Sequence, residues 1–229
     1  MVEQSLQYFI SSDVSTARCS TRKEKINKIA PRVPRDVVPN GIDLDRSVVD
    51  VPEGQNSIGF IGLMRYPPNV QAVLYFLKTI FPLVKQAIPD VKFFIAGKDP
   101  SGEILKLSDN KNVFVKGYVP DATTFMSKCA IMITPLLQGS GTRTKILEAM
   151  SLKKPVVSTS QGAEGLMVEN GKDIRIEDNP EAFAKSVVSL LKNKELREFI
   201  GGEAYKTVVS HYSWASIGNK LISDIKKIE

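Results

Sequence analysis

The sequence predicts an α/β protein built on a doubly wound parallel sheet, and three observations support this. From Ser57 onwards, short apolar runs rich in β-branched residues recur along the chain. Segments with helical periodicity separate these runs, as in parallel sheets that helices cover on both faces. Loops that carry glycine or proline follow four of the runs, and such sheets bind ligands at the carboxyl ends of their strands.

Each expected strand is a short apolar run, and each expected helix begins near a Pro, Ser or Asn that can start it. The expected strands are 58–62, 91–97, 112–117, 130–134, 155–159 and a shorter one at 173–176. Helices are expected at 69–88, 101–107 and 122–128, from the loop after the fourth strand to residue 152, and at 180–192, 194–212 and 214–227. Before this regular region, 6–10 fits a strand, 16–30 a basic helix, and 37–43 a strand that runs into a turn.

The composition excludes several classes of protein. The 229 residues carry 31 basic and 25 acidic side chains, a net charge of +6 without the dense basic stripe typical of nucleic-acid binding. The two cysteines, Cys19 and Cys129, are too far apart for a disulfide framework or a zinc motif, so a reducing, cytoplasmic setting is the default. No apolar run is long enough to span a membrane, although peripheral contact with its inner face stays open.

The most informative motif lies between the fourth strand and its helix, where the chain reads Gly-Ser-Gly-Thr-Arg-Thr-Lys from Gly139. Free N–H groups at a helix start, two glycines and the cations Arg143 and Lys145 together suit a diphosphate. Glu148, one turn further on, is suited to the paired hydroxyls of a ribose. The spacing is neither that of a P-loop nor that of a dinucleotide fingerprint, because Thr144 stands where the third glycine would be. The alternative is a tight turn in which Thr142 or Thr144 caps the helix.

Five other polar residues are ambiguous. Arg65 follows the first strand and suits a phosphate across the cleft or a solvated loop equally well, and Asn69 has the alternative of a helix cap. The pair Asp43 and Asp45 matches a metal-holding Asp-x-Asp motif, but it follows a turn outside the regular sheet. His211 is the single histidine and has no acidic or cysteine partner nearby in sequence. We therefore expect no metal and no cofactor.

Taken in order, these motifs resemble the C-terminal, donor-binding domain of GT-B glycosyltransferases, in particular the retaining family 4 group. The resemblance covers residues from about Val38 to the C-terminus. It rests on Pro39-Asn-Gly-Ile-Asp43, Phe60-Ile-Gly62 with Pro68-Asn-Val70, the block 139–150, Lys154-Pro-Val-Val-Ser-Thr159, Gly162-Ala-Glu-Gly-Leu166 and Tyr212-Ser-Trp214.

This resemblance implies a Rossmann-like donor domain over 51–229, and over 1–50 a remnant of the N-terminal acceptor domain with the segment that joins the two. It implies transfer of a sugar from a nucleotide-diphosphate sugar, with retention, to an acceptor glycan or lipid-linked sugar, as in polysaccharide biosynthesis. The implied catalytic residues are Arg143, Lys145 and Glu148. The implied donor-binding residues are Gly62, Arg65, Asn69, Gly97, Gly117, Tyr118, Val119, Gly139, Ser140, Gly141 and Thr142.

The sequence departs from the family pattern in two respects. Ser140 replaces the first glutamate of the Glu-x7-Glu pattern. The usual basic residues after the first strand fall near Leu63 and near Pro68 or Asn69, so Arg65, Arg143 and Lys145 are expected to substitute. Only about 36 residues precede Val37, so we expect a fragment or truncated product with little activity alone. The alternatives are a non-catalytic nucleotide-sugar-binding or partner subunit and a sugar-nucleotide epimerase of the same fold.

Overall fold

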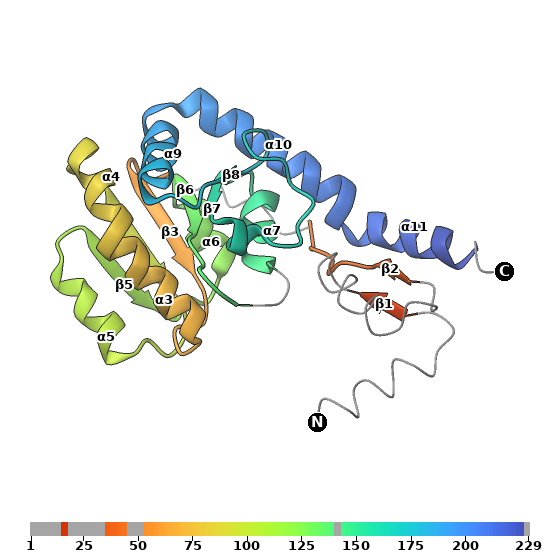
Figure 1. The fold of residues 1–229 in the computed structure, drawn as a ribbon, viewed down its shortest axis with the longest axis horizontal. Helices are drawn as coiled ribbons and strands as arrows, with labels where there is room; N and C mark the ends of the chain where they lie inside the picture. Colours follow the sequence, from red (N-terminus) through yellow and green to blue (C-terminus); the bar gives the residue numbers. More distant parts are fainter. Residues whose placement is uncertain (1–14, 18–34, 45–52, 140–142, 227–229) are drawn as a thin grey trace.

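The computed structural model describes residues 15–17, 35–44, 53–139 and 143–226 (Figure 1). Its centre is a six-stranded sheet in which every pair of neighbours is parallel. The strands are β3 (Ser57–Ile61), β4 (Lys92–Ala96), β5 (Val113–Gly117), β6 (Ile131–Thr134), β7 (Val156–Ser158) and β8 (Arg175–Ile176). Their order is β5-β4-β3-β6-β7-β8, the doubly wound order of Rossmann sheets, so the predicted fold class is confirmed.

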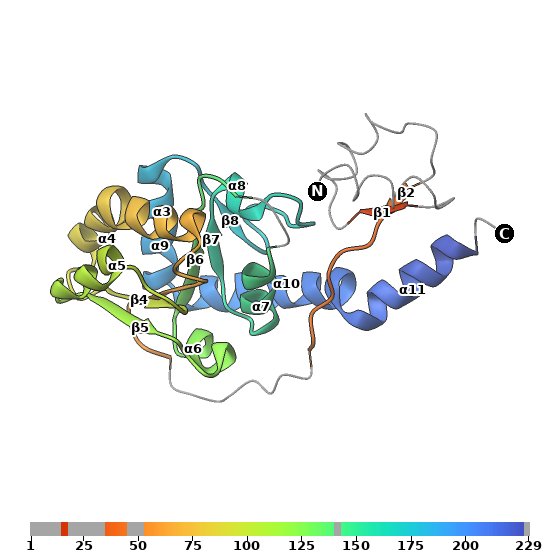
Figure 2. The same cartoon turned by 90° about the horizontal axis from the view of Figure 1, so that it is seen from below.

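Successive side chains of a strand point to opposite faces of the sheet and pack into two apolar cores, one on each face. In β6, Ile131 and Ile133 enter one core and Met132 enters the other. The first face is covered by α3 (Pro67–Tyr75), η1 (Phe76–Ile80), α4 (Phe81–Ala87) and α9 (Pro180–Lys192), and the second by α6 (Ala122–Ser127), α7 (Thr144–Ser151) and α10 (Lys194–Tyr212). Figure 2 shows α3 and α4 on one side of the sheet and α6 and α10 on the other.

The helix expected over 69–88 is present, but a π-helical turn, η1, divides it into α3 and α4. Pro82 has no N–H group, and in a continuous α-helix its ring would press on the carbonyl of Lys78. In η1 the Phe81 N–H bonds to the carbonyl of Phe76, five residues back, which accommodates the proline.

The helix expected at 101–107 is a single turn, α5 (Gly102–Leu105), followed by the 3₁₀ turn η2 (Lys106–Asp109). Ser101 begins it, because its hydroxyl accepts a bond from the Ile104 N–H at 3.4 Å. One further turn, α8 (Ser160–Ala163), was not expected from the sequence. The bounds of α9 and α10 agree with the prediction, and α11 runs over Trp214–Ile225. Within the described ranges, no helix combines the length and the apolar character needed to cross a membrane.

Near the N-terminus, β1 (Ser15–Ala17) pairs in parallel with β2 (Arg35–Val37). The predicted helix over 16–30 is therefore wrong at Thr16 and Ala17, whose backbone joins the ladder with Asp36 and Val37 instead. The remainder of that helix and the strand expected at 6–10 lie outside the described residues. The strand expected to begin at residue 37 ends there.

The segment that follows β2 is fixed to the turn between α10 and α11. The Ile42 N–H donates to the Tyr212 carbonyl at 2.7 Å, and Ile42 is buried. Gly41 packs against the Trp214 indole, which a Cβ at this position would strike. We call these four residues the junction.

Candidate functional site

The candidate site lies where the sheet reverses its winding, at the carboxyl ends of β3 and β6. These strands are neighbours, and the helices that follow them, α3 and α7, cover opposite faces. The chain leaves the sheet in opposite directions at this point, which opens the crevice in which doubly wound sheets bind ligands. The loop after β3 and residues 135–139 after β6 flank it. Of the predicted site residues, Ser140, Gly141 and Thr142 lie outside the described part of the chain.

Lys145 of α7 reaches across this crevice to the start of α3. Its Nζ donates to Asn69 Oδ1 at 2.8 Å and lies 4.5 Å from the centre of the Phe60 ring. The Asn69 Nδ2 group donates to the Leu63 carbonyl at 3.0 Å, so the amide cannot turn freely. Asn69 lies inside α3, whose cap position is Tyr66, and its interpretation as a helix cap is therefore wrong. Its side chain instead holds the lysine in place.

Two glycines allow this close packing. A Cβ on Gly62 would lie 2.7 Å from Asn69 Nδ2 and 2.8 Å from Lys145 Nζ, so only glycine leaves room for the pair. Gly97, at φ +155°, presses against the Gly62 carbonyl, which a Cβ would overlap. The Gly97 N–H donates to the Gly117 carbonyl at 2.7 Å, which ties the loops after β3, β4 and β5 together. Gly62, Gly97 and Gly117 thus form a rigid edge beside Lys145.

The environment of Lys145 lowers the pKa of its ammonium group to about 7. Burial is the largest cause, the positive charge of Arg143 adds to it, and Glu148 acts in the opposite direction. The acceptor at Asn69 is a neutral amide, and no carboxylate of the described residues forms an ion pair with Lys145. An anion bound here would supply a negative charge and stabilise the ammonium form of this lysine.

Arg143 is buried, and its guanidinium group holds the Gly139 loop to the segment after β7. Its Nη2 donates to the Gln161 carbonyl at 2.7 Å and to the Gly139 carbonyl at 3.1 Å, and it lies 3.4 Å from Glu164 Oε2. Gln161 makes the same connection, with Nε2 3.1 Å from the Gly139 carbonyl and 2.9 Å from Glu164 Oε2. Gln161 and Glu164 were not predicted as site residues, although Glu164 belongs to a motif that carries the family resemblance.

The remaining predicted residues lie on loops at the same edge of the sheet. Arg65 is exposed, and its Nε lies 3.8 Å from Asp99 Oδ2 in the neighbouring loop. Tyr118 is 60% exposed, and Lys98 Nζ lies 4.6 Å from the centre of its ring. Val119 is half-buried beside it. These side chains follow β3, β4 and β5, and Tyr118 offers an exposed aromatic ring with Lys98 over it.

The start of α7 also differs from one sequence interpretation. Arg143 occupies the cap position without a side-chain cap bond, and Thr144 is the first residue of the helix, so Thr144 is not the cap. Glu148 follows on the next turn and is half-buried. No cluster of three or more His, Cys, Asp or Glu side chains suited to a metal ion occurs within the described ranges.

Two relatives are similar to this chain in sequence. A 44.6 kDa protein of the cps region of Klebsiella pneumoniae, itself uncharacterized, is 28% identical over 176 residues, or 73% of this chain and 44% of that protein. The poly(ribitol-phosphate) alpha-N-acetylglucosaminyltransferase of Staphylococcus aureus is 30% identical over 146 residues, or 58% of this chain and 28% of that enzyme. The chain thus spans less than half the length of these relatives.

Solved structures share the fold at low sequence identity. The crystal structure of TarM has a TM-score of 0.80 at 19% identity and covers 97% of this chain and 45% of TarM. Anabaena HepE in complex with UDP and glucose has a TM-score of 0.73 at 17% identity, covering 94% of this chain and 63% of HepE. The family model for group 1 glycosyl transferases matches residues 55–193, more than half of the chain and the part that holds the whole sheet and the crevice. The chain belongs to the group 1 glycosyltransferases of GT-B fold.

Proposed function

We propose that this chain is the donor-binding portion of a retaining glycosyltransferase. It would bind a nucleotide-diphosphate sugar in the crevice and pass the sugar to an acceptor glycan or lipid-linked sugar. The observation that carries the proposal is the Lys145 ammonium group, held by Asn69 at the switch point of the sheet with no carboxylate ion-paired to it within the described ranges. A diphosphate would supply the negative charge that pairs directly with this basic group.

In the proposed reaction, the bond between the anomeric carbon and the diphosphate oxygen breaks, and the acceptor oxygen bonds to this carbon on the same face of the sugar. The acceptor hydroxyl loses its proton in this step, and the departing diphosphate takes it up. Negative charge collects on the departing diphosphate. Lys145 would stabilise this charge from a fixed position, without reorganisation as the reaction proceeds. Removing one such preorganised donor costs about 3 kcal/mol of barrier in enzymes studied by mutation. No metal is needed in this scheme, because the lysine and the start of α7 provide the positive charge.

Arg143 and Glu148 have different proposed roles. Because Nη2 of Arg143 already contacts Gly139, Gln161 and Glu164, its main contribution would be to hold Gly139 against the segment after β7. Glu148 would accept hydrogen bonds from the ribose hydroxyls. The resemblance to family 4 supports this role and the retention of configuration.

The nucleotide base has a proposed place against the loop after β5. Tyr118 offers an exposed ring on which a base could stack, a contact worth about 1–3 kcal/mol where it has been measured by alanine substitution. Arg65, on the loop after β3, would approach the diphosphate from the side opposite to α7. That the solved relative HepE was crystallised with UDP and glucose supports a nucleotide-diphosphate sugar as the class of ligand.

The first test is calorimetric titration of the chain with nucleoside diphosphates and nucleotide sugars, with and without Mg²⁺. We expect one base to bind, with equal affinity with and without the metal. Lys145→Met and Glu148→Ala should each weaken the binding, whereas Lys185→Met on the exposed surface of α9 should not. Transfer itself is tested in the longest form of the protein that the gene encodes. Equal binding by the Lys145→Met and Lys185→Met variants would refute the proposed site.

A nucleotide that binds in these tests without any transfer by that longest form would favour the alternative of a non-catalytic nucleotide-sugar-binding subunit. Conversion of the donor into an epimer without an acceptor would favour the epimerase. Both outcomes leave the site in place and change only the reaction assigned to it.

A further inference from the structure

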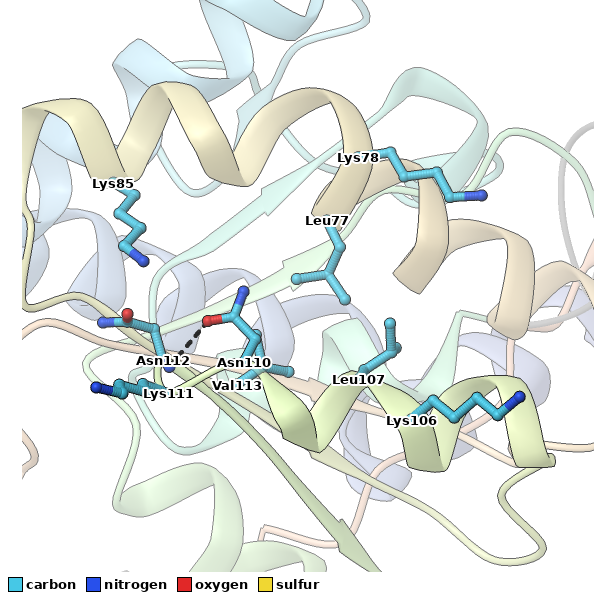
Figure 3. A pocket seen from close by; sticks show the side chains of 9 residues that line it. All are labelled: Leu77, Lys78, Lys85, Lys106, Leu107, Asn110, Lys111, Asn112 and Val113. Atoms are coloured by element: carbon cyan, nitrogen blue, oxygen red, sulfur yellow. Dashed lines mark hydrogen bonds between the residues drawn. The ribbon is translucent and has the colours of Figure 1, made fainter.

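The structure contains a groove at the other end of the sheet from the candidate site. It has a volume of about 710 Å³ and lies between η1 and α4 on one side and η2 with the start of β5 on the other (Figure 3). Val113, the first residue of β5, lies in its floor, so the groove opens at the amino end of the sheet and is separate from the candidate donor site. The short α5 explains it, because a single helical turn with a 3₁₀ extension does not reach across to cover η1.

Four lysines line this groove, and none of its nine lining residues is acidic. Figure 3 shows Lys85 and Lys111 at one end of the groove and Lys78 and Lys106 at the other. Among the described residues, none of these four lysines takes part in an ion pair. The groove therefore has positive charge at both ends and no compensating charge within its lining.

The middle of the groove is apolar and contains amide groups. Leu77 and Leu107 face one another between the two lysine pairs. Asn110 accepts a bond from the Asn112 N–H at 3.0 Å through Oδ1, which leaves its Nδ2 as the part of the amide that can donate. Asn112 is fixed, because its Nδ2 donates to the Val91 carbonyl at 2.8 Å. Such a groove suits a chain in which rings separate the anionic groups. The anionic groups would contact the lysines, the C–H faces of a ring would contact the leucines, and the ring hydroxyls would contact the amides.

We propose that this groove binds an anionic saccharide chain, one that carries phosphate or carboxylate groups, and holds it as part of the acceptor. The inference rests on the proposed function for its choice of a saccharide. The two lysine pairs would bind successive anionic groups, and the leucines would pack against the sugar ring between them. A membrane surface fits less well, because Leu77 and Leu107 line the interior of a concave groove, whereas a bilayer is contacted by side chains that protrude.

The test is calorimetric titration of the full chain with a galacturonate oligosaccharide, and with a neutral malto-oligosaccharide of the same length as the control. The double variants Lys85→Gln/Lys111→Gln and Lys78→Gln/Lys106→Gln each remove one end of the groove. Lys185→Gln/Lys192→Gln removes the same charge from exposed positions of α9. We expect each groove variant to bind the acidic oligosaccharide about tenfold more weakly, and the α9 variant to bind it as the unmodified chain does.

Several results would overturn the proposal: no binding of the acidic oligosaccharide, equal binding of the neutral one, or equal losses in the groove and α9 variants. Binding of phosphatidylglycerol vesicles without binding of the oligosaccharide would replace the saccharide with a membrane contact. Nucleotide-sugar binding is measured in the same variants and should be unchanged. Failure of the groove is thereby distinguished from failure of the donor site, since the two titrations use separate ligands.

Discussion

The pH dependence of donor binding follows from the position of Lys145. In the unliganded protein the pKa of this lysine is about 7, so its ammonium form disappears across neutral pH. A bound diphosphate favours the charged form, and binding must then be coupled to the uptake of a proton by Lys145. Between pH 6 and pH 8 the protonated fraction falls from about nine-tenths to about one-tenth. If only the protonated form binds, the affinity falls about tenfold, or about 1.4 kcal/mol.

A suitable assay is calorimetric titration with the nucleotide sugar that binds the chain, repeated in buffers of different ionisation enthalpy. A nucleotide sugar is preferable to a nucleoside diphosphate, because a terminal phosphate ionises near pH 6 and would add a second titration. We expect affinity to decrease as the pH rises through 7, with proton uptake at pH 8. In Lys145→Met the affinity should be low at pH 6 and flat with pH.

Glu148→Gln provides an independent control. The Glu148 carboxylate raises the pKa of Lys145 towards its ordinary value, so its removal should move the midpoint of the pH profile to lower pH. A flat profile in the unmodified chain would refute the reasoning. A step that persists unchanged in Lys145→Met would assign the titration to another group.

Three further predictions follow from the same packing. Asn69→Ala removes the hydrogen-bond acceptor of Lys145 and should lower nucleotide-sugar affinity at pH 6 by about tenfold or more in calorimetry, whereas equal affinity would contradict a positioning role. Gly97→Ala should cost about 3 kcal/mol in urea-induced unfolding, because its Cβ meets the Gly62 carbonyl at positive φ, whereas Gly102→Ala, which faces open space, should not destabilise the chain. Lys145→Met should raise the melting temperature at pH 7. Lys145 keeps its proton up to about pH 10.5 in the unfolded chain but only up to about pH 7 in the folded chain. The unmodified protein therefore becomes more stable as the pH rises from 7 to 10.5, and the difference in melting temperature between the two proteins should vanish near pH 10.5.

The sequence was sufficient to predict the sheet and the helices whose signals are local. Apolar residues dominate β3, β4, β6 and β7, and Asn179 and Asn193 cap α9 and α10 with side chains that accept the cap bonds. The one-turn helix α8 was missed because four residues carry no helical period. The π turn η1 was missed because a proline within the predicted helix, Pro82, is compatible with a kink, a break or a bulge. Only the packing of the helix on the sheet determines which of the three forms.

The contacts of the candidate site were less predictable, because they join segments that are distant in sequence. Asn69 and Lys145 are 76 residues apart, and they meet only because β3 and β6 are neighbours in the sheet. The same reason applies to Arg143, whose partners at Gln161 and Glu164 follow the next strand. The motif was sufficient to assign Arg143 and Lys145 to the candidate site. Their different surroundings, loop contacts for Arg143 and the Asn69 amide for Lys145, could be found only once the strand order was known.

The junction has a mechanical consequence for whatever is attached to this domain. The incoming chain at Gly41 and Ile42 is fixed to the outgoing chain at Tyr212 and Trp214, so the domain is entered and left at one point. A pulling force applied through both ends would load this contact first and reach the central sheet only after it had broken. A rotation of the attached segments would turn about the same point. The candidate site is therefore shielded from tension in the chain that carries it.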